Sequence, residues 1–568
     1  MNTETMTLKD LLVTAAGRFP DRPALSYVGE EPISYTRFID LAHAVTTLLA
    51  ANGVNPGDKV AIIGENMPNW AITYFAIVSS GAIAVPILQE FHVSAVHHIL
   101  RHSEAKVVVA SNRYLHKVEE GSFPNLKTVV VMDDFSVVDE QEQRTSFEEA
   151  VELGREKFEK FSDAARRFIE RKTGKGDSGL TSDSVAAILY TSGTTGHSKG
   201  VVLTHGNLVS NVLAGVATIP VFETDRFLSV LPMAHTYECT VGLLVPVHCG
   251  ASVHYLRKPP TPKTLLPAME QVRPTVMNVV PLIIEKIYKS RIKPKLSGKG
   301  VMGGLMKIGA ARRQVSRIAG RKLIEAFGGS LRCMCIGGAP LSPEVERFLG
   351  EAQVPYAIGY GMTETSPLLA GAPPDRQRFR AIGPPLPGIE LMIADPNPAT
   401  GEGEIYAKGP NVMREYYKAP RDTADTFTED GWLKTGDLGL IDEDGYLYIK
   451  GRLKNVIIGS SGENIYPEEI ESIINGCDHV MESMVYDAAG KLSARIHLNY
   501  ETLDEVFGVK KMMESEVRAK VQGVLEAVRQ ETNSKVSTFA RLARVVEQVE
   551  PFEKTPTQKI KRFIYLDN

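Results

Sequence analysis

The sequence has few of the features that would cross-link a small secreted domain, span a membrane or attract nucleic acid. Its 568 residues include five cysteines, an odd number without zinc-site spacing, which favours a reducing cytoplasm. The longest apolar stretch, 241–253, contains Pro246 and His248 and is shorter than the ~20 residues of a spanning helix. The first ten residues carry acidic side chains and no apolar core, so no signal peptide is expected. A net charge of −4 argues against nucleic acid as the main partner.

The composition that is present is that of a globular protein with more than one domain. Hydrophobic residues make up 43% and charged residues 23%, and the chain is too long for a single core. Helical and strand periods alternate near the N-terminus, with helices expected over 37–51 and 67–80 and strands over 59–63 and 82–86. This alternation predicts parallel βαβ units. We therefore expect an α/β fold, with a large multi-subdomain N-terminal domain followed by a small α+β C-terminal domain.

The segment 190–200, YTSGTTGHSKG, is the strongest functional signal in the chain. It follows an apolar run, 185–189, that predicts a buried strand. Its glycines permit tight turns, while its hydroxyls, backbone N–H groups and lysine can surround phosphate oxygens. The residues expected to contact phosphate are Thr191, Ser192, Gly193, Thr194, Thr195, Gly196 and Lys199. The segment is not a Walker A loop, since no window reads G-x-x-x-x-G-K-[ST].

Five other residues suit the remaining parts of a nucleotide. Tyr360 offers a flat face for a purine, and Asp437 can accept both ribose hydroxyls. Glu364 is a hard oxygen ligand of the kind that Mg²⁺ prefers. Arg452 and Lys559 can meet developing negative charge. Each residue taken singly also fits a core, turn or surface position, but together they predict a nucleotide site.

Seven segments resemble the adenylate-forming superfamily of acyl-CoA synthetases, adenylation domains and luciferases, over about residues 8–564. They read TSGTTGHSKG at 191–200, GGAPL at 337–341, GYGMTET at 359–365, KTGD at 434–437, GRLKN at 451–455, SGENIYPEEIE at 461–471 and TPTQKIKR at 555–562. LPMAHTYE at 231–238 and RPTVMNVVPLIIEKIY at 273–288 resemble the long-chain fatty-acid–CoA ligases in particular.

The resemblance implies a two-step ligase that uses ATP, Mg²⁺ and CoA. A fatty-acid carboxylate attacks the α-phosphate and gives acyl-AMP and pyrophosphate; the small domain then rotates and the thiol of CoA takes the acyl group. The implied boundaries are 1–452 for the N-terminal domain, 453–454 for the hinge and 455–568 for the C-terminal lid. An acyl–acyl carrier protein ligase and another carboxylic-acid–CoA ligase are alternatives. An amino-acid adenylation domain is disfavoured because no Asp occurs at 234–236, and a non-enzymatic acyl-binding paralogue because the catalytic residues are present.

The resemblance also assigns roles to individual positions. ATP and AMP contacts fall to the loop residues Thr191–Gly196 and Lys199, and to Gly338, Ala339, Pro340, Tyr360, Gly361, Met362, Thr363, Asp437 and Arg452. Catalytic roles fall to Lys559, Thr191, Thr363, Glu364 and His235, with Thr191 and Glu364 also as metal ligands. Lys454 would be the hinge residue, and Gly462 would face the CoA channel. Acyl chain length stays open, as does oligomeric state, with a homodimer as one alternative.

The segment 286–322 holds twelve Lys or Arg residues and no acid. Leu305, Ile308, Val315, Ile318 and Leu323 recur near helical spacing among these basic residues. This pattern is typical of an interfacial helix, and we put forward peripheral docking on anionic membranes as a hypothesis. The competing interpretation is a helix packed on the large domain, with its basic face solvated or lining a subunit contact.

Overall fold

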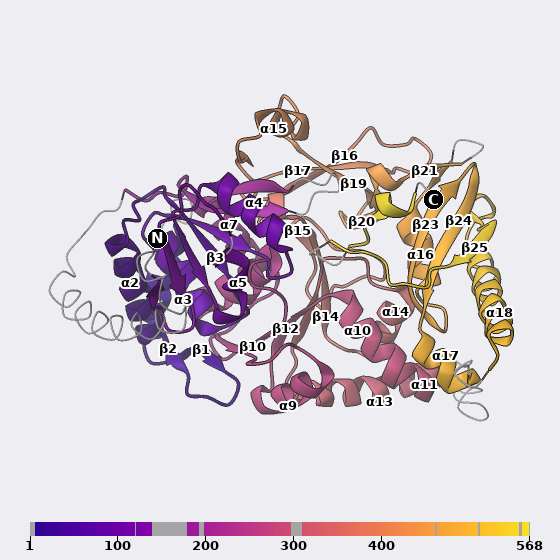
Figure 1. The fold of residues 1–568 in the computed structure, drawn as a ribbon. Helices are drawn as coiled ribbons and strands as arrows, with labels where there is room; N and C mark the ends of the chain where they lie inside the picture. Colours follow the sequence, from indigo (N-terminus) through magenta and orange to yellow (C-terminus); the bar gives the residue numbers. More distant parts are fainter. Residues whose placement is uncertain are drawn as a thin grey trace.

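The computed structural model describes residues 6–119, 121–138, 179–191, 198–296, 309–459, 463–508, 512–555 and 559–566. Within these ranges the chain forms two large sheets, a smaller four-stranded sheet, and a C-terminal domain built on three strands (Figure 1). The α/β fold class and the division into a large and a small domain are therefore confirmed.

The first large sheet carries the N-terminal βαβ units. Its strands, in spatial order, are β18 (Glu415–Tyr416), β9 (Lys199–Thr204), β8 (Val185–Thr191), β4 (Ile83–Ile87), β3 (Lys59–Ile63), β5 (Val107–Ala110), β6 (Thr128–Val131) and β7 (Val137–Val138). Strand β3 pairs in parallel with both β4 and β5, as the alternation of periods predicts. The associated helices are α2 (Tyr35–Ala51), α3 (Pro68–Ser79), α4 (Val93–Ser103), α5 (His116–Glu119) and α7 (His205–Thr218), with a short 3₁₀ turn at Asn112–Tyr114.

The second large sheet is built from the middle of the chain and the N-terminal strands. Its order is β15 (Leu368–Gly371), β14 (Tyr356–Gly361), β13 (Cys333–Ile336), β12 (Val276–Val279), β10 (Arg226–Ser229), β11 (Ser252–Tyr255), β1 (Pro23–Tyr27) and β2 (Ile33–Ser34). Its helices are α1 (Leu8–Arg18), η3 (Glu238–Leu244), α8 (Val245–Cys249), α9 (Pro262–Val272), α10 (Pro281–Ile287), η4 (Tyr288–Ile292), α11 (Lys293–Leu296), α13 (Gly309–Ala326) and α14 (Pro343–Glu351).

A four-stranded antiparallel sheet leads to the small domain. It contains β16 (Glu390–Ala394), β17 (Gly403–Lys408), β19 (Leu433–Ile441) and β20 (Leu447–Arg452), with α15 (Pro420–Thr426) beside it. The small domain follows with η6 (Leu453–Asn455), β21 (Ile457–Ile458), β22 (Asn464–Ile465), α16 (Pro467–Ile474), β23 (Val480–Ala488), β24 (Lys491–Leu498), α17 (Tyr500–Phe507), α18 (Glu514–Asn533), η8 (Thr538–Ala540), β25 (Arg544–Glu547) and η9 (Arg562–Tyr565).

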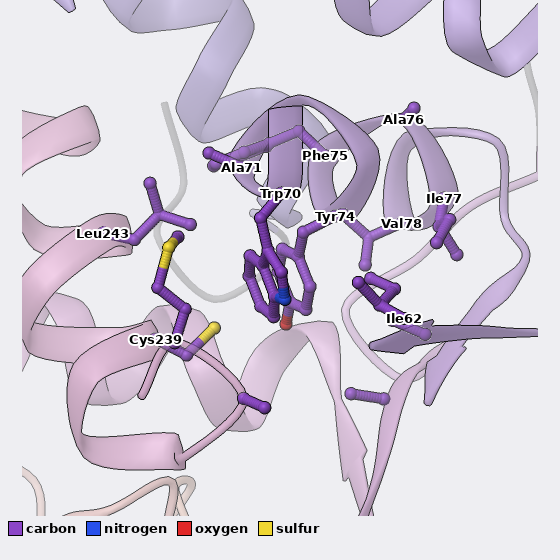
Figure 2. Close-up of a cluster of buried hydrophobic side chains, with 14 of the residues drawn as sticks. Ile62, Trp70, Ala71, Tyr74, Phe75, Ala76, Ile77, Val78, Cys239 and Leu243 are labelled. Atoms are coloured by element: carbon purple, nitrogen blue, oxygen red, sulfur yellow. The ribbon is translucent and has the colours of Figure 1, made fainter. Parts of the chain in front are cut away.

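Helix α3 joins the cores of the two large sheets. Almost every side chain from Pro68 to Val78 is buried, as expected for a helix that is apolar all round. Trp70 stacks on Tyr74 with ring centroids 5.5 Å apart. Figure 2 shows Cys239 and Leu243, from η3, on the side of Trp70 away from Val78 and Ile62. The segment that follows β10 is thereby fixed against a rigid core, which matters because that segment carries His235.

The basic segment forms helices, but not one continuous amphipathic helix. Residues 297–308, with Leu305 and Ile308, lie outside the described residues. Helix α13 packs closely on the end of α14, since a Cβ at Gly320 would lie 2.5 Å from the Ala352 carbonyl oxygen. Arg312, a basic residue of this segment, does not stand free on the helix surface, because it forms a two-pronged ion pair with Glu351 of α14. No helix among the described residues has both the length and the apolar character needed to cross a bilayer.

Candidate active site

Both ends of the expected phosphate loop are held by a hairpin. Strands β8 and β9 pair antiparallel, and Thr191 lies opposite Lys199. The Lys199 ammonium pairs with Asp422 of α15 at 2.6 Å and lies over the Tyr416 ring. The connecting residues 192–197 lie outside the described residues, so Ser192, Gly193, Thr194, Thr195 and Gly196 receive no structural account. The hairpin ends therefore fix where the loop begins and returns.

The segment after β14 turns sharply and presents a carboxylate. Gly361 allows the turn, since a Cβ there would lie 1.7 Å from the Pro367 carbonyl oxygen. The Met362 N–H donates to that same oxygen at 3.0 Å. Thr363 and Glu364 follow in a single 3₁₀ turn, with Glu364 buried and Thr363 half-buried. The sequence motif at 359–365 is thus a tight turn that only glycine permits at position 361.

Residues that the sequence analysis did not identify hold this turn in place. The Tyr416 hydroxyl donates to Glu364 Oε1 at 2.8 Å. The side-chain amides of Asn211 and Asn411 both donate to the Leu368 carbonyl oxygen, at 2.7 and 2.9 Å. These partners come from two segments that are distant in sequence, helix α7 and the stretch 411–416. No local pattern marks them in the sequence, because an Asn in a helix or a Tyr in a short strand has many ordinary roles.

Asp437 is held by two of the residues expected beside it. It is buried near the middle of β19, the Tyr360 hydroxyl donates to Oδ2 at 2.8 Å, and the Arg452 Nε lies 3.1 Å from Oδ1. Burial, reinforced by the Asp437 charge, raises the pKa of Tyr360 well above its usual value, so the hydroxyl keeps its proton and remains a donor. The Asp437 carboxylate is therefore fixed in orientation before any sugar hydroxyl approaches.

The expected adenine contacts lie where parallel strands end. Strands β12, β13 and β14 run parallel, and Gly338, Ala339 and Pro340 follow β13 as an exposed turn. Gly338 has φ +85°, a left-handed conformation that favours glycine. The Tyr237 hydroxyl donates to the Cys335 carbonyl oxygen at 2.9 Å and so ties the segment after β10 to strand β13, just before this turn. Ligands of open α/β sheets bind at this kind of strand edge.

His235 is positioned as a neutral hydrogen-bond donor. Its Nδ1 accepts the Tyr237 N–H at 3.2 Å, so the proton of the neutral ring belongs on Nε2. Burial, together with the nearby Lys559 charge, lowers the pKa of His235 to about 4. The ring is therefore uncharged at neutral pH and can donate from Nε2.

Lys559 brings the small domain into the same site. The residue as a whole is exposed, yet surrounding protein desolvates its ammonium. This desolvation, with the Arg452 charge, lowers the pKa of Lys559 to about 8, while Asp437 and Glu364 act in the opposite direction. Of the two remaining predicted positions, Lys454 lies exposed in η6 between the domains, and Gly462 lies outside the described residues. The structure thus places Arg452, Asp437, Glu364 and His235 close enough to Lys559 for their charges to act on one another.

Comparison with known proteins agrees with this arrangement. Residues 12–417 match the model of the AMP-binding enzyme family. The chain is 31% identical to the long-chain-fatty-acid–CoA ligase FadD15 of Mycobacterium bovis over 80% of this chain and 75% of that protein. It is 29% identical to the peroxisomal long chain acyl-CoA synthetase 6 of Arabidopsis thaliana, over 90% of this chain and 77% of that protein. The crystal structure of ATP-bound MatB from Rhodopseudomonas palustris aligns over 99% of both chains, with a TM-score of 0.73 and 25% identity. The chain therefore belongs to the AMP-binding enzyme family and, within it, to the long-chain-fatty-acid–CoA ligases.

Proposed function

We propose that this site joins a long- or medium-chain fatty acid to ATP and then transfers the acyl group to CoA. In the first step a carboxylate oxygen attacks the α-phosphorus, the bond to the β-phosphate breaks, and pyrophosphate leaves. In the second step the CoA sulfur attacks the acyl carbonyl carbon, and AMP leaves with the electron pair. Both the acid and ATP are anionic, so the chain must offset their repulsion.

The observation that carries this proposal is the position of Lys559. It comes from the small domain, yet its pKa responds to Arg452, Asp437 and Glu364 of the large domain. A cation delivered by a separate domain is suited to stabilising charge in one step and being withdrawn in the next. Thr363, half-buried beside Glu364, offers a hydroxyl to the α-phosphate.

His235 would orient the acyl carboxylate. Its neutral ring, with Nδ1 occupied by the Tyr237 N–H, leaves Nε2–H to donate to a carboxylate oxygen without neutralising it. The carboxylate keeps its nucleophilic charge while its direction is set. A positively charged histidine would instead hold the nucleophile back as an ion pair.

The residues present fit Mg²⁺ with few protein ligands. Glu364 is buried, its Oε1 accepts from Tyr416, and no ion pair joins it to a Lys or Arg of the described residues. Those residues also contain no group of three or more His, Cys, Asp or Glu that could enclose a metal. Mg²⁺ binds in this way, through one or two carboxylates and substrate phosphates, and Glu364 with Thr191 would hold it here. When bound, it would neutralise phosphate charge.

We assign the hinge to 453–454, with the N-terminal domain at 1–452 and the lid at 455–568. Lys454 is exposed in a one-turn element that follows β20 directly, so a torsion change there would disturb little packing. Rotation about this point would withdraw Lys559 and bring the segment near Gly462 toward the CoA channel.

Pyrophosphate release across fatty acids of graded length, with and without CoA, tests the function. Release with the acid alone and thioester formation with CoA are expected, with an optimum in chain length because each buried methylene contributes about 0.8 kcal/mol. The matched control is Lys559→Met, which should lower the rate of release about 10²–10³-fold with every acid. Pyrophosphate release that is followed by acyl transfer to a carrier protein, but not to CoA, would contradict CoA as the acceptor.

We further propose that this is a cytoplasmic enzyme that docks on anionic membranes through α13. All five cysteines are free, which suits a reducing compartment. The outward face of α13 carries four exposed basic residues, Arg313, Arg317, Arg321 and Lys322, and an exposed Ile318. A basic face with an apolar residue suits the interface of an anionic bilayer.

A further inference from the structure

Lys289 reaches from the large domain to the backbone of the small domain. It lies on η4, which continues α10 toward α11, beside the C-terminal domain in Figure 1. Its ammonium donates to the Asn475 carbonyl oxygen and, at 3.4 Å, to that of Val480. Asn475 is the C-cap of α16, and Val480 is the first residue of β23. A partly buried lysine of the basic segment is therefore used in a contact between domains.

Lys293, one turn further along, meets the same place. Its ammonium donates to the Gly476 carbonyl oxygen at 3.3 Å and pairs with Asp478 at 3.0 Å. It also lies 3.4 Å from Glu344 of α14, in its own domain. Burial acts to lower the pKa of Lys293, but Glu344 and Asp478 outweigh it and raise the pKa. The lysine therefore stays charged in this contact.

The end of α16 lacks a cation of its own. The helix has no basic residue in its last turn, and Asn475 is its C-cap. The Asn475 side chain is occupied within the small domain, since its Oδ1 accepts from Ser483 at 2.8 Å. Free carbonyl groups at a helix C-terminus carry partial negative charge and favour nearby cations. Here both cations come from the other domain.

Helix α16 connects this contact to Lys559. Its buried Glu471 pairs with Arg562 at 2.5 Å, and Arg562 also donates to the Val485 carbonyl oxygen at 3.1 Å. Arg562 follows Lys559 by three residues in the C-terminal tail. One end of α16 is thus held by the large domain, while its side binds the tail that carries Lys559.

We propose that Lys289 and Lys293 are positioning residues that hold the small domain in the orientation for acyl-AMP formation. This rests on the proposed two-step function. Neither lysine touches the ATP site. Rotation about 453–454 must carry the end of α16 away from them, so the contact stabilises only one of the two orientations. A contact present in one state shifts the equilibrium toward that state.

Half-reaction kinetics of Lys289→Met, Lys293→Met and the double variant test the proposal. Fatty-acid-dependent ATP–pyrophosphate exchange should fall about threefold to thirtyfold in the double variant. Thioester formation from supplied acyl-AMP and CoA should be unchanged or faster. Lys286→Met is the matched control, because Lys286 is exposed on the preceding turn, and it should leave both rates as in the wild type. Asp478 is exposed, and Asp478→Asn should lower ATP–pyrophosphate exchange to a smaller extent and leave thioester formation unchanged.

Hydrogen exchange without substrates gives a readout that needs no activity. Amides at 288–293 and 475–480 should lose protection together in the double variant and keep it in Lys286→Met. The proposal would be overturned if the double variant lost the same rate in both half-reactions. It would also be overturned if the double variant kept both the hydrogen-exchange protection and the half-reaction rates of the wild type. If the wild type shows the protection but activates no fatty acid, the proposed function fails and the domain contact stands.

Discussion

At the scale of single residues, the surroundings of Lys559 set when it carries charge. Its pKa of about 8 means that the ammonium is present below that pH and is lost above it. We expect kcat/KM for pyrophosphate exchange to be flat below about pH 8 and to fall above it, because this parameter reports the free enzyme. Bound ATP adds negative charge, so kcat should begin to fall at a higher pH than kcat/KM does.

Lys559→Arg is the control for the fall in kcat/KM above about pH 8, since a guanidinium stays charged over the whole pH range of the assay. The fall above about pH 8 should disappear in this variant. If kcat/KM of this variant still fell at the same pH, the titration of another group would be responsible for the fall.

Lys559→Ala tests whether the charge acts in one step only. Loss of one electrostatic donor typically costs about 10²–10³ in rate, and we expect that loss in acyl-AMP formation. Thioester formation from supplied acyl-AMP should be spared. Single-turnover assays of each step measure both. Equal losses in the two steps would rule out a role confined to the first.

Gly361 is a second residue whose role follows from geometry alone. In Gly361→Ala the new Cβ would lie 1.7 Å from the Pro367 carbonyl oxygen, so backbone must move. We expect a loss of about 1–3 kcal/mol or more in the free energy of unfolding, and weaker ATP binding as Glu364 shifts. Denaturant midpoints and ATP titration measure the two effects.

Gly17→Ala is the comparison for that variant. Gly17 is exposed in α1, with nothing within 4 Å of a built Cβ, and alanine there should stabilise the helix by up to about 1 kcal/mol. If Gly361→Ala melted and bound ATP like the wild type, the turn would have to be more adaptable than its contacts imply.

At the scale of elements, hydrophobic periodicity predicted those helices and strands whose apolar residues repeat with a single period and lie on one face. The helix expected over 37–51 is α2 (Tyr35–Ala51), and the strand expected over 59–63 is β3. The turn at 442–445, which joins β19 to β20, reads Asp-Glu-Asp-Gly, a composition typical of hairpin turns. The π-helical turns η3 and η4 had no sequence signal, because an extra residue in a helical turn is set by packing rather than by composition.

The site was predictable only in part for a related reason. Motif residues such as Asp437 and Glu364 could be named because their chemistry suits a nucleotide. Their supports, Tyr416, Asn211 and Asn411, could not, because each acts through a contact that only the tertiary fold creates. The use of Lys289 and Lys293 between domains was hidden in the same way inside a run of basic residues.

The proposed hinge is a single element whose rigidity can be changed. Lys454 lies in the 3₁₀ turn η6, and proline suits the φ of such a turn. Lys454→Pro should therefore keep the orientation described here and resist the torsion change of rotation. We expect thioester formation to slow more than acyl-AMP formation. Wild-type rates for both steps would mean that rotation occurs elsewhere, and Lys454→Ala separates loss of the side chain from loss of backbone freedom.

At the scale of the whole molecule, the site exists only where separate units meet. The β8–β9 hairpin, the strand ends of the second large sheet, β19 of the small sheet and the tail of the small domain each supply part of it. In the proposed mechanism, no unit alone binds ATP and presents Lys559, so one unit moves while the others keep the nucleotide in place.

The outward face of α13 adds a prediction about where the molecule works. Arg312 is occupied by Glu351, so the residues that face solvent are Arg313, Arg317 and Arg321 with Lys322. Each basic residue near an anionic surface contributes about 1 kcal/mol. Changing Arg313, Arg317 and Arg321 to Gln should therefore lower binding to phosphatidylserine liposomes by about a hundredfold, without changing ATP affinity. Co-sedimentation measures the binding.

Salt and a matched loss of charge separate docking from a general effect of net charge. Binding through α13 should fall as salt rises, since screening acts over about 10 Å at 0.1 M, and should need anionic lipid. Changing Arg37, Arg101 and Lys127, exposed residues outside α13, to Gln removes the same charge from elsewhere and should leave most of the binding intact. Equal sedimentation of the wild type and the α13 variant would end the proposal. A change in sedimentation coefficient without lipid would instead identify the face as a contact between copies of this chain, because removing three cations would then alter assembly before any membrane is present.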